Sequence, residues 1–322
     1  MKKMILTIVA LTLLVGCSLP GLGGSARNDD IVVAGGNTAE RRIMAEVLVQ
    51  MINHYLPELS TNIIDNLGTT MLIVQTITRQ DANFSSIMYT GTSLTGELGM
   101  PATTDTQEAF QKVIEGYNQQ FNAVWFPSYG FANTYAFMVR RDFALEQGIT
   151  KVSDLEALAA DVSVGVDDSW ITRQGDGYED FQKIYGFSFD DIFPMSIGLV
   201  YTAVQSGDVD VVLGYSTDGR IDAYDLVLLE DDLALFPPYD ASPIITHQIL
   251  DSHPEIEEVI LKLENTIDES MIQAMNRQHD EYRVEAAIIA QEFLESNNYF
   301  EDKQVVPLHQ RPLYQPVFEG GH

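Results

Sequence analysis

The chain has 322 residues, of which 47 are acidic and 18 basic, which gives a net charge of -29 at pH 7. Its hydrophobic content of 45% is typical of a globular protein and argues against disorder. Such an acidic chain repels phosphates, so we expect no nucleic-acid partner and no direct binding of the protein surface to anionic lipid. Solubility is the first explanation for the acidic surface, and attraction of cationic ligands is a second one.

The first residues are typical of an export signal. Two lysines precede an apolar run at 4–15, which is too short to span a bilayer as a stable helix. The run ends in Leu-Val-Gly-Cys, which resembles the lipobox of bacterial lipoproteins. We therefore expect a signal peptide at 1–16, lipid on Cys17 and a flexible tether at 17–30. Cys17 is the only cysteine, so it has no disulfide partner.

Strands and helices alternate along the rest of the chain. The pattern predicts a strand at 31–34 and then a helix to about Tyr55, with Asn37 as N-cap and Glu40 three residues later. Further strands are predicted near 61–65, 84–88, 135–140, 162–166, 210–215 and 226–230. A short helix is predicted to start at 153–155, and further helices are predicted at 69–79, 105–120, 177–185, 196–206, 254–263, 267–278 and 283–294.

This alternation predicts an α/β protein with two lobes, because the pattern of strand and helix occurs once before about residue 139 and again between 140 and 240. A helical block follows and needs a surface to cover. We expect lobe I to comprise 31–138 and 241–300, and lobe II to comprise 139–240. The tail at 301–322 lacks a periodic pattern, so we expect it to be loosely ordered.

Four tyrosines lie in short, unusual segments. They are Tyr89 in Tyr-Thr-Gly-Thr, Tyr135 in Asn-Thr-Tyr-Ala-Phe, Tyr215 in Gly-Tyr-Ser-Thr-Asp-Gly-Arg and Tyr239 in Pro-Pro-Tyr-Asp. A quaternary ammonium group has no N–H to donate, and aromatic faces attract it by roughly 0.5–2 kcal/mol per ring. The tyrosines together indicate a cage for such a cation, while each one taken alone is more typical of a core or interface residue.

The chain resembles the extracytoplasmic substrate-binding lipoproteins of bacterial ABC transporters for glycine betaine, carnitine and choline. The resemblance covers nearly all of 31–300. Its segments are Asn66-Leu67-Gly68, Tyr89-Thr90-Gly91-Thr92, 125–131 (WFPSYGF), 133–137 (NTYAF), 175–178 (GDGY), 215–221 (YSTDGRI) and 236–240 (FPPYD). It implies a two-lobed periplasmic-binding-protein fold of type II, with the ligand in the cleft between the lobes and its trimethylammonium group in a box of tyrosines.

The resemblance also implies the site residues, partners and location. It makes the four tyrosines the walls of the box and places Thr92 near the other end of the ligand, where a neutral side chain tolerates a carboxylate. Relatives often have Gln in place of Asn37, so Asn37 either contacts the ligand or only caps its helix. The expected partners are a small quaternary ammonium solute and the permease subunits of the transporter. The expected location is the outer face of the bacterial cell membrane, through lipid on Cys17.

Other residues that could serve a site have simpler explanations. Trp125 and Trp170 could line a cation site but are expected to pack in cores. Three aspartates could hold a metal but lack EF-hand spacing, so we expect them to be solvated loop acids: Asp167, Asp168 and Asp176. Arg220 could pair with a carboxylate ligand but is expected to pair with Asp218 and Asp222, and Arg173 could reach the cleft.

Two other functions remain to be weighed. An enzyme is one, but none of the six histidines falls in a His-Glu-x-x-His motif and there is no Gly-x-Ser-x-Gly elbow. A binding protein for an amino acid or another solute without a quaternary nitrogen is the second. That site would use an acid–base pair and fewer aromatic walls. We expect no cofactor and no metal.

Overall fold

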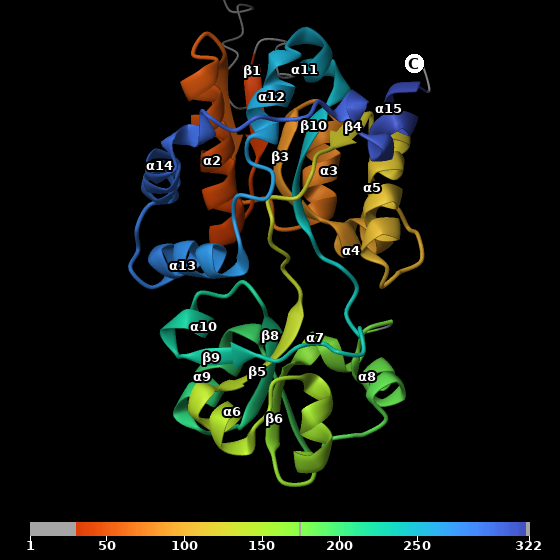
Figure 1. The fold of residues 1–322 in the computed structure, drawn as a ribbon, viewed down its shortest axis with the longest axis vertical. Helices are drawn as coiled ribbons and strands as arrows, with labels where there is room; N and C mark the ends of the chain where they lie inside the picture. Colours follow the sequence, from red (N-terminus) through yellow and green to blue (C-terminus); the bar gives the residue numbers. More distant parts are fainter. Residues whose placement is uncertain (1–29, 174, 320–322) are drawn as a thin grey trace, which may run out of the picture.

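The computed structural model describes residues 30–173 and 175–319 and has two lobes, each built on a five-stranded sheet (Figure 1). The expected signal peptide, Cys17 and all but the last residue of the expected tether lie outside the described residues. Within these residues no helix is both long and apolar enough to cross a membrane.

Lobe I contains both ends of the described chain (Figure 1). Its sheet has the order β2-β1-β3-β10-β4, in which β1 pairs in parallel with β2 and β3, and β10 pairs antiparallel with β3 and β4. Its elements are β1 (Asp30–Ala34), α2 (Ala39–Tyr55), β2 (Ser60–Ile64), α3 (Thr70–Thr78), β3 (Phe84–Tyr89), α4 (Thr90–Thr92), α5 (Thr106–Phe121), β4 (Ala123–Trp125), β10 (Ala241–Thr246), α11 (His247–Ser252), α12 (Glu255–Leu261), α13 (Glu269–Asp280), α14 (Ala286–Ser296) and α15 (Gln315–Glu319).

Lobe II repeats this arrangement with the order β7-β6-β8-β5-β9, in which β6 is parallel to β7 and β8, and β5 is antiparallel to β8 and β9. Its elements are β5 (Tyr135–Arg140), α6 (Arg141–Gln147), β6 (Ser163–Asp167), α7 (Asp168–Ile171), α8 (Tyr178–Tyr185), β7 (Asp191–Met195), α9 (Ile197–Ser206), β8 (Val211–Tyr215), α10 (Arg220–Ala223) and β9 (Leu226–Leu228). Separate apolar clusters fill the two lobes. Trp125 lies in the core of lobe I and Trp170 in that of lobe II, as expected.

Two segments cross between the lobes side by side (Figure 1). One leads from β4 to β5 and the other from β9 to β10. Ala132 pairs with Asp240 in an isolated antiparallel bridge, and the backbone N–H of Asn133 donates to the Tyr239 carbonyl at 3.2 Å. Because both crossings are tied together at this point, the lobes meet at a two-stranded hinge, and residues of the hinge lie beside the space between the lobes.

The first crossing ends earlier than the sequence pattern indicated. β5 begins at Tyr135, so lobe II starts at Tyr135 rather than at residue 139. The pattern also missed β4, β7 and β10. Both β7 and β10 contain a proline, which normally argues against a strand. Pro194 is tolerated because β7 is an edge strand, and Pro243 because it lies where the register of β10 shifts against β3.

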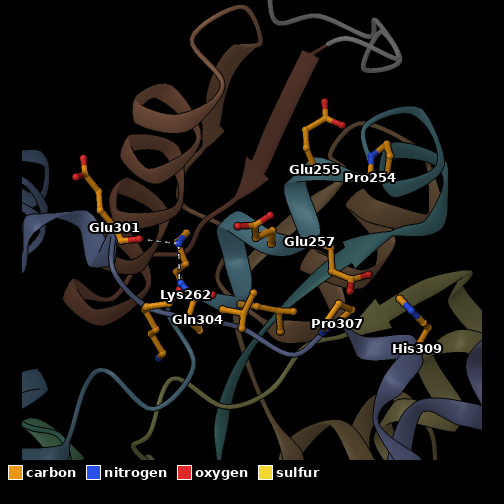
Figure 2. Close-up of a pocket in the computed structure, with 12 residues that line it drawn as sticks. Pro254, Glu255, Glu257, Lys262, Glu301, Gln304, Pro307 and His309 are labelled. Carbon is orange, nitrogen blue, oxygen red and sulfur yellow. Dashed lines mark hydrogen bonds between the residues drawn. The ribbon is translucent and has the colours of Figure 1, made fainter.

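The prediction of a loosely ordered tail was wrong for the part that the structure describes. Leu308, Tyr314 and Val317 are almost completely buried in the core of lobe I. Lys262, on the C-terminal end of α12, donates to the carbonyl oxygens of Glu301 at 3.3 Å and Lys303 at 3.2 Å (Figure 2). The tail is therefore held by single buried side chains and backbone contacts, which leave no periodic pattern in the sequence.

Candidate ligand-binding site

A cavity of about 200 Å³ lies between the lobes and combines residues of both lobes with residues of the hinge. Its lining residues are Arg41, Thr70, Tyr89, Thr92, Asn133, Tyr135, Arg173, Tyr215 and Tyr239. The structure thus brings together all four tyrosines and Thr92, which lie far apart in the sequence. Asn37 is exposed and is not among the residues that line the cavity.

Strand ends place three of the tyrosines. Tyr89 is the last residue of β3, Tyr215 is the last residue of β8, and Tyr135 is the first residue of β5. Because β5 and β8 are antiparallel, Tyr135 pairs directly with Tyr215, and their ring centroids lie 5.1 Å apart at an interplanar angle of 36°. Tyr239 comes from the second crossing segment. Each wall is therefore fixed by the backbone of a sheet or of the hinge.

The phenol groups of three walls donate hydrogen bonds to carboxylates. Tyr135 donates to Asp167 Oδ2 at 2.6 Å, Tyr239 to Asp176 Oδ2 at 3.2 Å, and Tyr89 to Glu40 Oε1. Burial, and after it the neighbouring acid, raises the pKa of each of these tyrosines well above its ordinary value. The three phenols therefore keep their protons at neutral pH and remain donors.

Tyr215 differs from the other walls. It is 39% exposed, whereas the other three tyrosines are at most 9% exposed. Its backbone N–H donates to the Tyr201 hydroxyl at 2.7 Å, and the same hydroxyl donates to the Tyr215 carbonyl at 3.1 Å. Tyr201 thus holds the end of β8, while the Tyr215 ring itself is the wall most open to solvent.

Two guanidinium groups complete the polar part of the cavity. Arg173 donates from Nη2 to the Tyr239 hydroxyl at 2.6 Å, and its Nε lies 2.5 Å from Asp176 Oδ1. The same guanidinium lies 5.4 Å from the centroid of the Tyr135 ring. Arg41 donates to the Ile87 carbonyl at 3.0 Å and lies 5.3 Å from the centroid of the Tyr89 ring. The cavity therefore offers both aromatic faces and positively charged donors.

Gly91 allows α4 to lie directly against the hinge. A Cβ atom at this position would come within 2.8 Å of the Pro238 carbonyl oxygen and 2.9 Å of the Tyr239 ring. Thr90 next to it donates to the same carbonyl at 2.8 Å and accepts from the Asp240 N–H at 3.0 Å. The Tyr-Thr-Gly-Thr segment thus carries Tyr89 and Thr92 and also positions Tyr239.

Three expectations about single residues need correction. Thr38, not Asn37, caps α2, because its side chain accepts from the Arg41 N–H. Asp167 and Asp176 are not solvated loop acids: each is only 4% exposed and accepts from a tyrosine of the cavity. Arg220 pairs with Asp218 at 2.7 Å as expected, but Asp222 pairs instead with Arg277 at 2.6 Å.

Sequence reasoning also missed several residues around the cavity. Arg41, Thr70 and Asn133 line it, and Glu40 accepts the Tyr89 hydrogen bond. The sequence pattern places Glu40 only at the start of a helix. Its position beside an expected strand-turn-helix junction was the one signal that could have placed it near a ligand.

A larger cavity, of about 580 Å³, lies on lobe I between α12 and the C-terminal segment (Figure 2). Four glutamates and two lysines are among its lining residues, and none of those residues is Tyr, Trp or Phe. Lys262 in this cavity is already engaged by backbone carbonyls. The larger cavity therefore lacks the aromatic faces that the cavity between the lobes provides.

Comparison with known proteins agrees with this architecture. The solved structure described as "Crystal structure of glycine betaine/carnitine/choline ABC transporter" superimposes with a TM-score of 0.82 at 41% identity, covering 84% of this chain and all of that one. Lactococcal OpuAC in its closed form with glycine betaine is 13% identical, with a TM-score of 0.52, and supports the fold alone. The predicted two-lobed periplasmic-binding-protein fold is confirmed.

Relatives with known names lead to the same family. The carnitine transport binding protein OpuCC of Listeria monocytogenes is 44% identical over 309 residues, which are 94% of this chain and all of the relative. A glycine-betaine-binding protein of Pseudomonas aeruginosa is 27% identical and covers 91% of this chain and 96% of its own length. The family "Substrate binding domain of ABC-type glycine betaine transport system" matches residues 29–296. The chain belongs to this family of extracytoplasmic transport proteins, which is not a family of enzymes.

Proposed function

We propose that this protein captures quaternary ammonium solutes such as glycine betaine, carnitine and choline in the cavity between its lobes and delivers them to the permease of an osmoprotectant ABC importer. The observation that carries the proposal is the convergence of four tyrosines from both lobes and the hinge on one cavity. Closely packed aromatic faces suit a cation that cannot donate hydrogen bonds.

The polar groups of the cavity favour a quaternary over a primary ammonium group. Its nine lining residues include no Asp or Glu, so a primary ammonium group would meet no directly facing carboxylate. Thr92 is neutral, and Arg41 and Arg173 are positively charged. A carboxylate at the far end of the ligand is therefore tolerated, which favours a range that includes the zwitterions glycine betaine and carnitine.

Binding and closure are coupled in this proposal. Tyr89 belongs to lobe I, Tyr135 and Tyr215 belong to lobe II, and Tyr239 belongs to the hinge. A ligand that touches walls from both lobes binds the closed arrangement better and shifts the population towards it. The closed form would then dock on the permease, and ATP hydrolysis elsewhere in the complex would drive uptake.

Calorimetric titration of the purified protein with glycine betaine, carnitine, choline and proline tests the proposal. We expect tight binding of one or more trimethylammonium ligands and no comparable binding of proline. Folded protein that binds none of the three trimethylammonium ligands would refute it. Binding of proline with equal affinity would instead favour the second function, a protein for solutes without a quaternary nitrogen.

The anchor is a separate part of the proposal. Cys17 follows an apolar run and a lipobox-like sequence, and it lies outside the described residues. We expect it to be lipid-modified and to hold the protein at the outer face of the cell membrane. Mass spectrometry of the protein extracted from membranes should show the lipid on Cys17, and Cys17→Ser should release the protein into the medium. Membrane retention of Cys17→Ser would contradict the lipid anchor.

A further inference from the structure

Three of the four tyrosine walls have a buried carboxylate behind them. Glu40, Asp167 and Asp176 are 3%, 4% and 4% exposed, and they accept the phenol hydrogen bonds of Tyr89, Tyr135 and Tyr239, respectively. None of these carboxylates lines the cavity itself. Fully buried Asp and Glu residues are rare unless they are paired, so three of them behind the rings of one cavity call for a physical reason.

The three carboxylates differ in their neighbouring charges. Asp176 is neutralised by Arg173, whose Nε lies 2.5 Å away. Glu40 and Asp167 form no ion pair within the part of the chain that the structure describes. Glu40 is surrounded by neutral donors, the side-chain amides of Asn133 at 3.1 Å and Asn276 at 3.3 Å in addition to Tyr89.

Asp167 is held in a similar way in lobe II. It accepts from the Ser169 hydroxyl at 2.5 Å and from Tyr135 at 2.6 Å. Arg41 follows Glu40 in the sequence, but its guanidinium donates to the Ile87 carbonyl and lies beside the Tyr89 ring. In the same way, the Arg173 guanidinium lies beside the Tyr135 ring, 5.4 Å from its centroid. Each of the two carboxylates therefore has one guanidinium beside the ring that it bonds, without an ion pair to it.

We propose that Glu40 and Asp167 are specificity-determining residues that act through Tyr89 and Tyr135 and make the cavity select for a positively charged head group. This inference rests on the proposed function. Each carboxylate fixes a phenol as donor and thereby the direction of its ring face. Each also adds a negative charge behind the ring, where it attracts a cation through a poorly solvated medium without touching it.

Fixing the orientation of a tyrosine ring does not by itself require a carboxylate. A neutral Asn or Gln side chain also has an oxygen that accepts a phenol hydrogen bond, and its burial costs far less than that of a charge. Both oxygens of Glu40 and Oδ2 of Asp167 accept hydrogen bonds from the protein, and neither carboxylate lines the cavity, so neither would serve as a hydrogen-bond acceptor for a ligand there. What they add beyond orientation is charge, which attracts a positively charged head group.

Amide variants separate charge from orientation. Glu40→Gln and Asp167→Asn keep an oxygen that can accept the phenol hydrogen bond, while they remove the charge. Each trimethylammonium ligand that the wild type binds is compared with its tert-butyl analogue, in which carbon replaces the nitrogen. Taking roughly 9 Å between a carboxylate and the ligand nitrogen, we expect each variant to bind the cation about five- to twentyfold more weakly. The tert-butyl analogue should change by less than about twofold, because it carries no charge at that position.

Asp210→Asn is the matched control. Asp210 directly precedes β8, and Tyr215 ends that strand, so the two residues lie about 17 Å apart at roughly 3.3 Å per residue. The control removes one negative charge from lobe II, the lobe of Asp167, and also removes a hydrogen-bond acceptor of Ser163. We expect its affinity for the cation to stay within about twofold of the wild type.

The outcomes distinguish the inference from the function on which it rests. A fall in affinity for the cation that exceeds the fall for the analogue supports the inference. Equal falls for both ligands would show that the carboxylates only hold the rings in place, and unchanged affinity in both variants would overturn the inference as well. If a tert-butyl analogue binds too weakly to titrate, the affinity of each amide variant for the cation is compared with that of Asp210→Asn. A lower affinity in the amide variant then supports the inference. Failure of the wild type to bind any trimethylammonium ligand would refute the proposed function itself. The two variants lie in different lobes, so misfolding of one leaves the other as a test.

Discussion

Replacing Tyr215 by alanine tests the aromatic cage most directly. Tyr215 is the most exposed wall, and its ring contacts Tyr135 at 5.1 Å between centroids. Loss of one ring face removes roughly 0.5–2 kcal/mol of attraction for a cation, which corresponds to a fall in affinity of about 2- to 30-fold. The substitution also removes the aromatic pair, which costs about 0.5–1.5 kcal/mol of folding stability. The backbone bonds between Tyr215 and Tyr201 do not depend on the ring and are retained.

Calorimetric titration at fixed salt, well below the melting temperature of each variant, measures this effect. Tyr215→Phe keeps the ring, and we expect it to bind within about twofold of the wild type, because no described residue bonds the Tyr215 hydroxyl. Tyr282→Ala is the matched control: this tyrosine is 60% exposed and lies on lobe I outside the cavity. If Tyr215→Ala and Tyr282→Ala bind the ligand equally well, Tyr215 is not a wall of the site.

Three further predictions concern the frame of the site. Gly91→Ala should displace the Tyr239 ring, because the new Cβ atom would lie 2.9 Å from it, and titration should show a fall in affinity of about 2- to 30-fold, as for the loss of one ring. Leu308→Ala should lower the free energy of unfolding by about 2–5 kcal/mol in a denaturant titration, because Leu308 is fully buried, while binding at 25 °C should stay unchanged. Burial raises the pKa of Tyr89 and Tyr135 in the folded state, so their contribution to stability is complete below about pH 10 and is lost as the pH rises further. The melting temperature should therefore fall between about pH 10 and 11, and a constant value over that range would contradict the buried, protonated phenols.

The alternation of strands and helices was enough to predict the two lobes, but not every strand. β10 is an interior strand of the sheet of lobe I, between β3 and β4, yet Pro243 within it lacks the N–H that a ladder requires. Only the register shift at this position shows why the proline is tolerated, and a register shift depends on the neighbouring strand. The same limit applies to the tail, whose ordering depends on the buried side chains of Leu308 and Tyr314 and not on a local pattern.

The positions of the four tyrosines and Thr92 in one cavity could be anticipated, because the segments that carry them are unusual and resemble those of a known family. The carboxylates that accept the hydrogen bonds of these tyrosines could not be anticipated from the sequence. Sequence indicates which residue types prefer a helix start, but Asn37 and Thr38 both suit that position, so the pattern could not show that Thr38 is the cap. Glu40 and Asp167 become meaningful only when the fold places them against Tyr89 and Tyr135.

The position of Tyr215 also determines which rate its loss should change. The three buried walls donate hydrogen bonds to carboxylates, whereas the Tyr215 ring on lobe II is the wall most exposed to solvent. A cation that enters from solvent can reach the three buried walls without Tyr215, so association should change little. Dissociation requires the ligand to leave the Tyr215 ring as the lobes separate. Tyr215→Ala should therefore mainly raise the dissociation rate. Stopped-flow measurements on Tyr215→Ala should therefore show the loss of affinity in dissociation. A loss seen mainly in association would mean that Tyr215 guides entry and does not close the cage.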